Sequence, residues 1–123
     1  MTCKFVFMPS LDQSIKQLKK RYRNISVDIE KALEAVEANP EIGAVIPDDY
    51  MVRKMRVASR DMQRGKQGGF RLLYKLDTLE SEQLVAYLLL IYAKTDREDI
   101  TRKELEELVR NLSFSKDKKE NDR

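Results

Sequence analysis

The sequence predicts an α+β fold with an N-terminal strand, a two-helix hairpin, an antiparallel sheet of about four strands and a C-terminal helix. Three observations favour this class. Apolar residues recur at helical spacing from residue 11 to 36 and again from 105 to 112, residues 51–58 and 70–76 alternate between polar and apolar, and residues 84–94 are apolar on both faces. A chain of 123 residues suits one such domain.

The N-terminal part reads as one strand followed by two helices. Residues 4–8 are rich in β-prone side chains, and Pro9 ends this strand because it has no N–H to donate to a sheet. Ser10 with Gln13 three residues later predicts a capping box at the start of the first helix. The second helix ends at Asn39-Pro40, since the residue before a proline is disfavoured in helical conformation.

The basic strands come next and are followed by a hairpin. In residues 51–58, Lys54 and Arg56 share one face, whereas Arg53 points to the other. Arg71 lies on the following strand, and the polar residues 77–83 predict a turn into the central strand 84–94. The two helices are expected to cover one face of this sheet, which leaves the other face for the basic residues.

The C-terminal helix has its own start signal. Thr101 and Glu104 form a second predicted capping box, and an apolar stripe follows to Leu112. Residues 1–112 are therefore expected to form a single domain, and the charged residues 113–123 a flexible tail.

Charge is concentrated in one segment. Residues 51–75 hold eight basic residues and a single acid, a net charge of +7, although the whole chain carries only +3. Such a cationic surface favours a polyanion, because neutralised phosphates release their condensed counterions. The structural alternative, a solvated face or a protected sheet edge, normally mixes charges of both signs.

Composition excludes several kinds of chemistry. The chain has no histidine and one cysteine, Cys3, so neither an internal disulfide nor a His or Cys zinc cluster is possible. We expect no metal and no cofactor, and we read Cys3 as a small buried hydrophobe. No apolar run is long enough to span a bilayer, which predicts a soluble cytoplasmic protein without a membrane partner.

Three segments together resemble one protein family. The strings NPEIGAVIP, RKMRVASRDMQRGKQGGFRLLY and LLLIYAKTDREDITRKELEEL resemble, in order and spacing, the RelE/HigB toxins of bacterial type II toxin-antitoxin systems, within the RelE/ParE superfamily. The resemblance covers residues 5 to about 112. It implies a RelE-like fold and a toxin that enters the ribosomal A site and cleaves the messenger RNA there as an mRNA interferase. It also implies a cognate antitoxin, often of the helix-turn-helix type.

The chemistry of RNA cleavage suits a cluster of lysine and arginine. Attack of the 2′-hydroxyl on the adjacent phosphate needs a base, cations for the developing charge and an acid for the leaving 5′-oxygen. By the resemblance, Arg56 and Arg71 are expected to clamp the phosphate, with Lys54 as proton acceptor or its electrostatic helper. Lys94 is the candidate acid and Tyr92 the second candidate, since the family's C-terminal tyrosine or histidines are absent from this chain.

Further residues are expected to contact RNA outside this cluster. The loop 60–67 is either a plain hairpin tip or an arm that orders on RNA, and Tyr92 is either a half-buried packing residue or a ligand contact. The predicted RNA-binding set comprises Arg53, Arg60, Arg64, Lys66 and Tyr92.

Two rival functions stay open. A non-catalytic inhibitor of DNA gyrase on the same fold, as ParE toxins are thought to be, would have no need for Lys54, Arg56 and Arg71 in one cationic site. A plain nucleic-acid-binding module would use the same charges without chemistry. The favoured hypothesis is a metal-independent endoribonuclease, a hydrolase whose partners are messenger RNA, the ribosome and an antitoxin.

Overall fold

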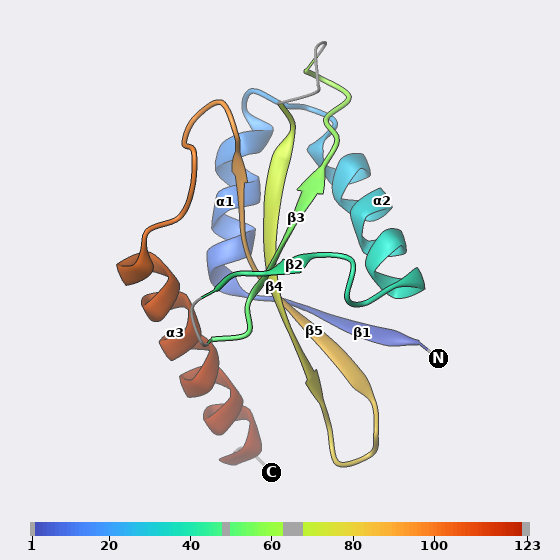
Figure 1. Ribbon diagram of the computed structural model, residues 1–123, viewed down its shortest axis with the longest axis vertical. Helices are drawn as coiled ribbons and strands as arrows, with labels where there is room; N and C mark the ends of the chain where they lie inside the picture. Colours follow the sequence, from blue (N-terminus) through green and yellow to red (C-terminus); the bar gives the residue numbers. More distant parts are fainter. Residues whose placement is uncertain (1, 48–49, 63–67, 122–123) are drawn as a thin grey trace.

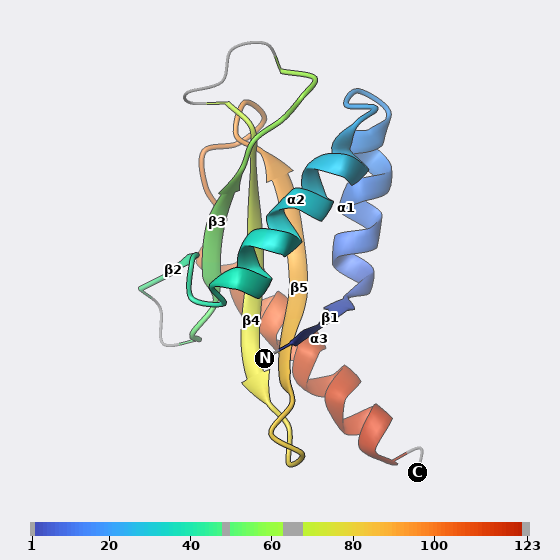
Figure 2. The same ribbon diagram turned by 90° about the vertical axis from the view of Figure 1, so that its right-hand side faces the viewer.

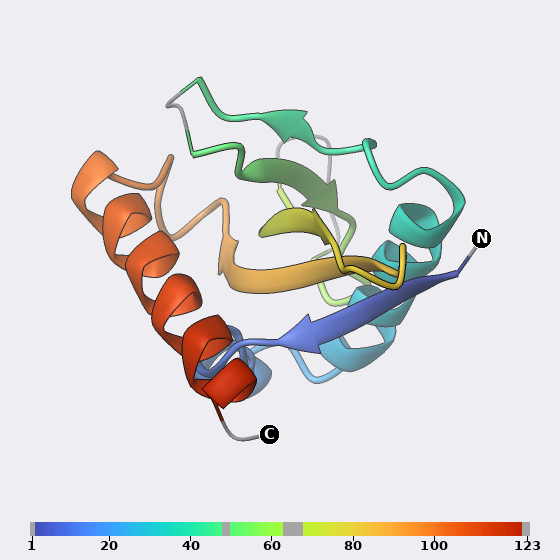
Figure 3. The same cartoon turned by 90° about the horizontal axis from the view of Figure 1, so that it is seen from below.

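A five-stranded mixed sheet forms the centre of the molecule (Figure 1). The computed structural model describes residues 2–47, 50–62 and 68–121, with side chains up to residue 112. The strand order β1-β5-β4-β3-β2 is visible from below in Figure 3. The strands are β1 (Cys3–Phe7), β2 (Ala44–Val45), β3 (Arg53–Val57), β4 (Phe70–Thr78) and β5 (Leu84–Ala93).

The α+β class and the order of elements agree with the sequence prediction, and the sheet has one strand more than expected. The additional strand is β2, whose two residues are too few to leave an alternating pattern. β1 pairs parallel with β5, whereas the three other pairings are antiparallel. Local alternation gives the face of a side chain but not the direction of its partner strand.

The helices lie on both faces of the sheet. Helices α1 (Pro9–Lys19) and α2 (Ile25–Ala38) cover the same side, as Figure 2 shows. Their apolar stripes pack with Phe70, Leu72 and Tyr74 of β4 into the larger core. Helix α3 (Arg102–Asn121) packs on the other side, where Leu105 and Leu112 join a second core. This helix covers only part of its face, so the remainder stays open for the basic residues.

The start of α1 differs from the sequence prediction. The helix begins at Pro9 without a side-chain cap, so the predicted capping box of Ser10 and Gln13 is wrong. The Ser10 Oγ instead donates to the Leu89 carbonyl at 2.6 Å, and the Ser14 Oγ accepts the Ile91 N–H at 3.3 Å. The pairing of β5 with β1 ends at Leu88, so the two hydroxyls supply partners for backbone groups of β5 that β1 does not reach. Only the tertiary structure creates this need.

The start of α3 agrees with the prediction. The Glu104 N–H donates to the Thr101 Oγ1 at 3.1 Å, and the Thr101 N–H donates back to the Glu104 carboxylate at 3.0 Å. These reciprocal bonds are those of a capping box. The helix then continues to Asn121, and the flexibility of residues 113–123 stays a prediction.

A β-bulge in β5 changes which side chains share a face. Leu73 pairs with Leu90 and Tyr74 pairs with Leu88, which leaves Leu89 as the extra residue. Before the bulge Leu88 packs in the core beneath α1 and α2, and after it Ile91 does. The alternation is therefore shifted by one, and Tyr92 and Lys94 turn to the open face that carries Arg71.

Candidate active site

An open pocket of about 530 Å³ lies on the part of the sheet that α3 leaves uncovered. The four residues predicted to be catalytic from the sequence all line it, although they come from three separate segments of the chain. The lining residues are Lys54, Met55, Arg56, Arg71, Lys94 and Glu98. The structure thus brings the four cations together, and their catalytic roles stay predictions.

The strand register explains this gathering. Arg56 of β3 lies directly opposite Arg71 of β4, and Arg71 lies opposite Tyr92 of β5. The Lys94 N–H donates to the Gly69 carbonyl at 3.0 Å, which keeps Lys94 beside the first residues of β4. Cross-strand neighbours on one face lie about 5 Å apart, so one row of the sheet presents both arginines to the pocket.

Gly69 allows the strands to approach at this point. Its φ is +76°, and a Cβ at this position would stand 2.5 Å from the Val57 carbonyl oxygen. A residue with a side chain would therefore separate the end of β3 from the start of β4. Gly69 therefore has a structural reason of its own, independent of any ligand.

The two arginines differ in exposure but share the lack of an acidic partner. Arg71 is only 8% exposed, and its Nη1 donates to the carbonyls of Gly68 at 3.3 Å and Phe70 at 3.2 Å. Arg56 is exposed. Within the described part of the chain, neither guanidinium forms an ion pair. Like charges directly opposite each other on a sheet are destabilising, so this pair suits an added anion.

The two lysines, by contrast, already have acceptors from one loop. The Lys54 Nζ lies 3.1 Å from the Asp99 carboxylate, and the Lys94 Nζ donates to the Glu98 carbonyl at 2.6 Å. Burial alone would raise the pKa of Asp99, but the Ile100 N–H and the Lys54 ammonium lower it overall. Asp99 was not predicted from the sequence, where the acidic residues that follow Lys94 are its only signal.

Tyr92 lies next to this pocket without opening to solvent. It is 5% exposed, and its hydroxyl oxygen is fully shielded and has no hydrogen-bond partner of acceptable geometry among the described residues. The Arg97 guanidinium lies over the ring at 5.4 Å from its centre. Burial raises the pKa of Tyr92, as does the Asp99 carboxylate, while Arg71 and Arg97 oppose the shift. Tyr92 therefore packs as a buried residue beside the pocket.

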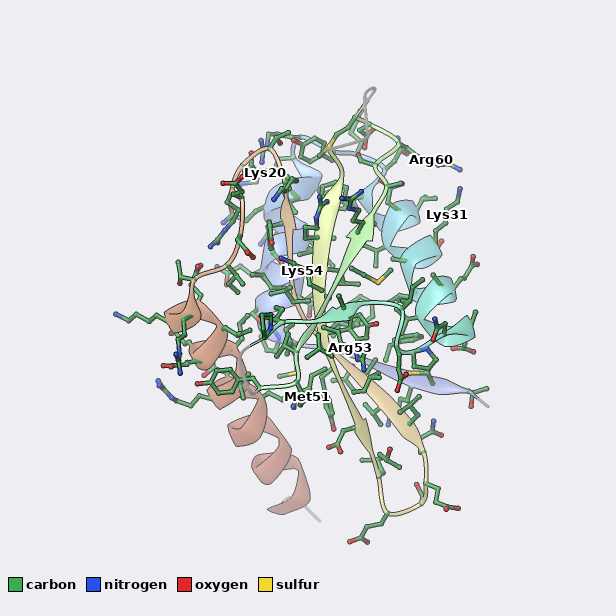
Figure 4. All side chains as sticks on the ribbon, viewed as in Figure 1. Lys20, Lys31, Met51, Arg53, Lys54 and Arg60 are labelled. Atoms are coloured by element: carbon green, nitrogen blue, oxygen red, sulfur yellow. The ribbon has the colours of Figure 1, made fainter. Side chains whose placement is uncertain are left out.

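The other residues of the predicted RNA-binding set lie outside the pocket. Arg53 donates to the carbonyls of Gly43 at 2.8 Å and Glu41 at 3.2 Å, and β-alternation places it on the face opposite Lys54. Arg60 is exposed beyond the end of β3, higher than Lys54 in Figure 4. Arg64 and Lys66 fall outside the described residues. The role of this set in RNA binding stays a prediction.

Two structural features are absent from the residues that the structure describes. No group of three His, Cys, Asp or Glu side chains there is arranged to hold a metal ion. No helix in those ranges combines the length and apolar character needed to cross a membrane.

Comparisons with known proteins give structural neighbours alone. No family model matches the sequence, and no curated protein matches it. A mutant of the E. coli toxin RelE in the free state is 19% identical over 80% of this chain and 90% of its own, with a TM-score of 0.48. The toxin-antitoxin complex RelBE2 from Mycobacterium tuberculosis is 17% identical over 74% of this chain and 96% of its own, also with a TM-score of 0.48.

Proposed function

We propose that this chain is a RelE-like toxin of a type II toxin-antitoxin system, and that its cationic pocket cleaves messenger RNA on the ribosome without a metal ion. One observation carries the proposal: Arg56 and Arg71 lie opposite each other on adjacent strands in an open pocket, and neither forms an ion pair with an acidic side chain among the described residues. The order and spacing of the sequence motifs that resemble RelE/HigB toxins support the same function.

The pocket holds the groups that cleavage by 2′-hydroxyl attack requires. Arg56 and Arg71 bind the non-bridging oxygens of one phosphodiester and stabilise the charge that develops there. Lys54, as a free amine, accepts the 2′-hydroxyl proton while the 2′-oxygen bonds to phosphorus. Lys94 gives a proton to the 5′-oxygen as its bond to phosphorus breaks, and the products are a 2′,3′-cyclic phosphate and a 5′-hydroxyl end.

Arg71 has the geometry of a fixed phosphate clamp. Its guanidinium is held by two backbone carbonyls and is largely buried, so it loses little side-chain entropy when it binds an anion. Arg56 is less constrained in comparison, because it is exposed and makes no hydrogen bond with a described residue. We assign Arg71 to positioning and charge stabilisation, and Arg56 to closing on the bound phosphate.

The cell biology follows from the proposed reaction. A toxin that cuts messages on the ribosome acts in the cytoplasm, with the ribosome and its bound messenger RNA as partners. A cognate antitoxin, of the helix-turn-helix type by the sequence resemblance, would block the pocket or prevent entry into the ribosome.

The test compares three single substitutions in a translating extract. We expect Arg71→Ala and Arg56→Ala to lower message cleavage about 10²- to 10³-fold, the effect of removing one donor that stabilises transition-state charge. Arg110→Ala is the matched control, because this exposed arginine lies on α3 outside the pocket. Cut sites are mapped by primer extension, and growth arrest is scored in cells.

Arg56→Ala guards against a folding artefact, since it removes an exposed side chain, whereas Arg71 is buried. Undiminished cleavage by both variants, with cut sites unchanged, would reject the proposal. Gyrase-dependent DNA damage in cells that express the wild-type chain, without message cleavage, would favour the inhibitor alternative instead.

A further inference from the structure

The loop between β5 and α3 supplies an acceptor to each pocket lysine. Asp99 provides a carboxylate to Lys54 at 3.1 Å, and Glu98 provides its backbone carbonyl to Lys94 at 2.6 Å. The two arginines of the pocket receive no acceptor from this loop. The loop therefore contacts both groups that the proposed reaction needs for proton transfer, and it neutralises the charge of Lys54.

Several bonds hold the loop in this conformation. The Arg97 Nε donates to the Asp99 carbonyl at 3.2 Å, and its guanidinium pairs with Glu104 in the first turn of α3. The Asp99 carboxylate also accepts the Ile100 N–H at 2.8 Å. Because that carboxylate is fixed by its own backbone neighbour, its position against Lys54 is built into the chain and is not the chance contact of two long side chains.

Asp99 has the charge and donor set of a bound phosphate oxygen. The carboxylate accepts from the Lys54 ammonium and lies within the electrostatic influence of Lys94, and both lower its pKa. It is thus an anion at neutral pH. A phosphodiester oxygen that approached Lys54 would require the same ammonium and would be repelled by this charge.

We propose that Asp99 is an internal competitor for substrate phosphate: its carboxylate occupies Lys54 and is displaced when a phosphate group enters the pocket. The inference rests on the proposed function for the identity of the substrate, but not for the competition itself. It makes the contact autoinhibitory: while the Lys54 ammonium pairs with Asp99, it is not available to a substrate phosphate.

The exposure of the pair makes the displacement easy. The Lys54 side chain is 31% exposed and that of Asp99 is 61% exposed, so the ion pair is partly solvated and weak. An entering phosphate also gains Arg56 and Arg71, which Asp99 leaves without an acidic partner. The Lys54–Asp99 contact therefore excludes weakly binding anions from the pocket, and it is displaced by a group that binds both arginines.

The experiment measures binding with two probes on the full chain. A fluorescein-labelled single-stranded RNA is titrated by anisotropy at low salt, and inorganic phosphate is titrated separately as a competitor. Asp99→Asn removes the charge and keeps an oxygen for the Ile100 N–H. Asp96→Asn is the matched control in the same loop, because it deletes the same charge from a carboxylate that pairs with Arg21 outside the pocket.

We expect Asp99→Asn to tighten RNA binding about fivefold relative to Asp96→Asn, with the gain fading as salt screens the charge. Tighter binding of inorganic phosphate as well would show that the competition concerns one phosphate group. Tighter binding of RNA alone would show that Asp99 competes with the RNA chain and not with a single phosphate group. Equal affinities of the two variants for both probes would overturn the proposal.

Cleavage in translating extract separates this inference from the proposed function. If the wild-type chain cuts no message, the proposed function fails, and the binding comparison still decides the competition. If the wild-type chain cuts, Asp99→Asn is expected to cut at least as fast. Loss of cleavage with tighter RNA binding would overturn the inference, because Asp99 would then act in the reaction and not give way to the substrate.

Discussion

Removal of the Tyr74 hydroxyl is expected to destabilise the whole fold, because this one atom joins the sheet to the loop that follows α2. Tyr74 is fully buried in β4. Its hydroxyl donates to the Pro40 carbonyl at 2.8 Å and accepts the Gly43 N–H at 2.9 Å. Gly43 must be a glycine here, since a Cβ would lie 2.9 Å from the ring. One tyrosine hydroxyl thus holds both Pro40 and Gly43 against the sheet.

The expected size follows from the groups left without partners. In Tyr74→Phe the buried Gly43 N–H loses its acceptor, at a cost of about 1–3 kcal/mol in unfolding free energy. The half-buried Pro40 carbonyl can recover a bond to water and adds little. Because Arg53 also donates to the Gly43 carbonyl, the loop keeps a second attachment and the fold survives.

The assay is urea unfolding followed by circular dichroism, with Tyr22→Phe as the control. Tyr22 packs edge-on against Phe70 at 5.3 Å between ring centres, and its hydroxyl forms no hydrogen bond with a described residue. The control should change the unfolding free energy by no more than about 0.5 kcal/mol. Equal stabilities of the two variants, at unchanged denaturant dependence, would refute the role assigned to the Tyr74 hydroxyl.

Two further predictions concern the junctions that flank the pocket. Gly69→Ala should cost more than about 1 kcal/mol in unfolding free energy, because it combines a positive φ with a Cβ 2.5 Å from the Val57 carbonyl; a thermal midpoint like that of the wild type would contradict this close approach. Arg97, followed by the Thr101 N–H, lowers the pKa of Glu104 from 4.5 to about 2. Its folded-state pKa therefore lies below the unfolded one, so its stabilisation is present above about pH 5 and is lost as the pH falls toward about 2. The advantage of the wild type over Glu104→Gln in unfolding free energy should shrink over that range, and a difference independent of pH would exclude this linkage.

The sequence predicted the face on which the strand residues lie. Alternation in residues 51–58 put Lys54 and Arg56 together and Arg53 opposite them, and the structure agrees. The same alternation explains why Arg53 lies outside the pocket, since a side chain on a strand points to only one face of the sheet. The capping box of Thr101 was likewise predictable, because all its partners lie within one helical turn.

Features set by distant partners were missed. Ser10 has the local pattern of a helix cap, but its hydroxyl donates to the Leu89 carbonyl instead of capping the helix. Asp99 has no motif, and only the path of the loop after β5 brings its carboxylate to Lys54. In both cases, the partner is separated in the chain by many residues, and no periodicity links the two.

The sequence by itself determined the three helices, four of the five strands, their order and the cationic character of one face, because these depend on spacing and composition within short segments. Tertiary structure alone decided that Lys94 and Tyr92 share that face, since the bulge at Leu89 reverses the alternation of β5. It also decided the partners of these cations: Lys54 pairs with the Asp99 carboxylate, Lys94 and Arg71 donate to backbone carbonyls, and neither arginine forms an ion pair among the described residues. The physical reason is that the electrostatic energy of a charged side chain depends on its distance to other charges, and folding of the sheet sets those distances.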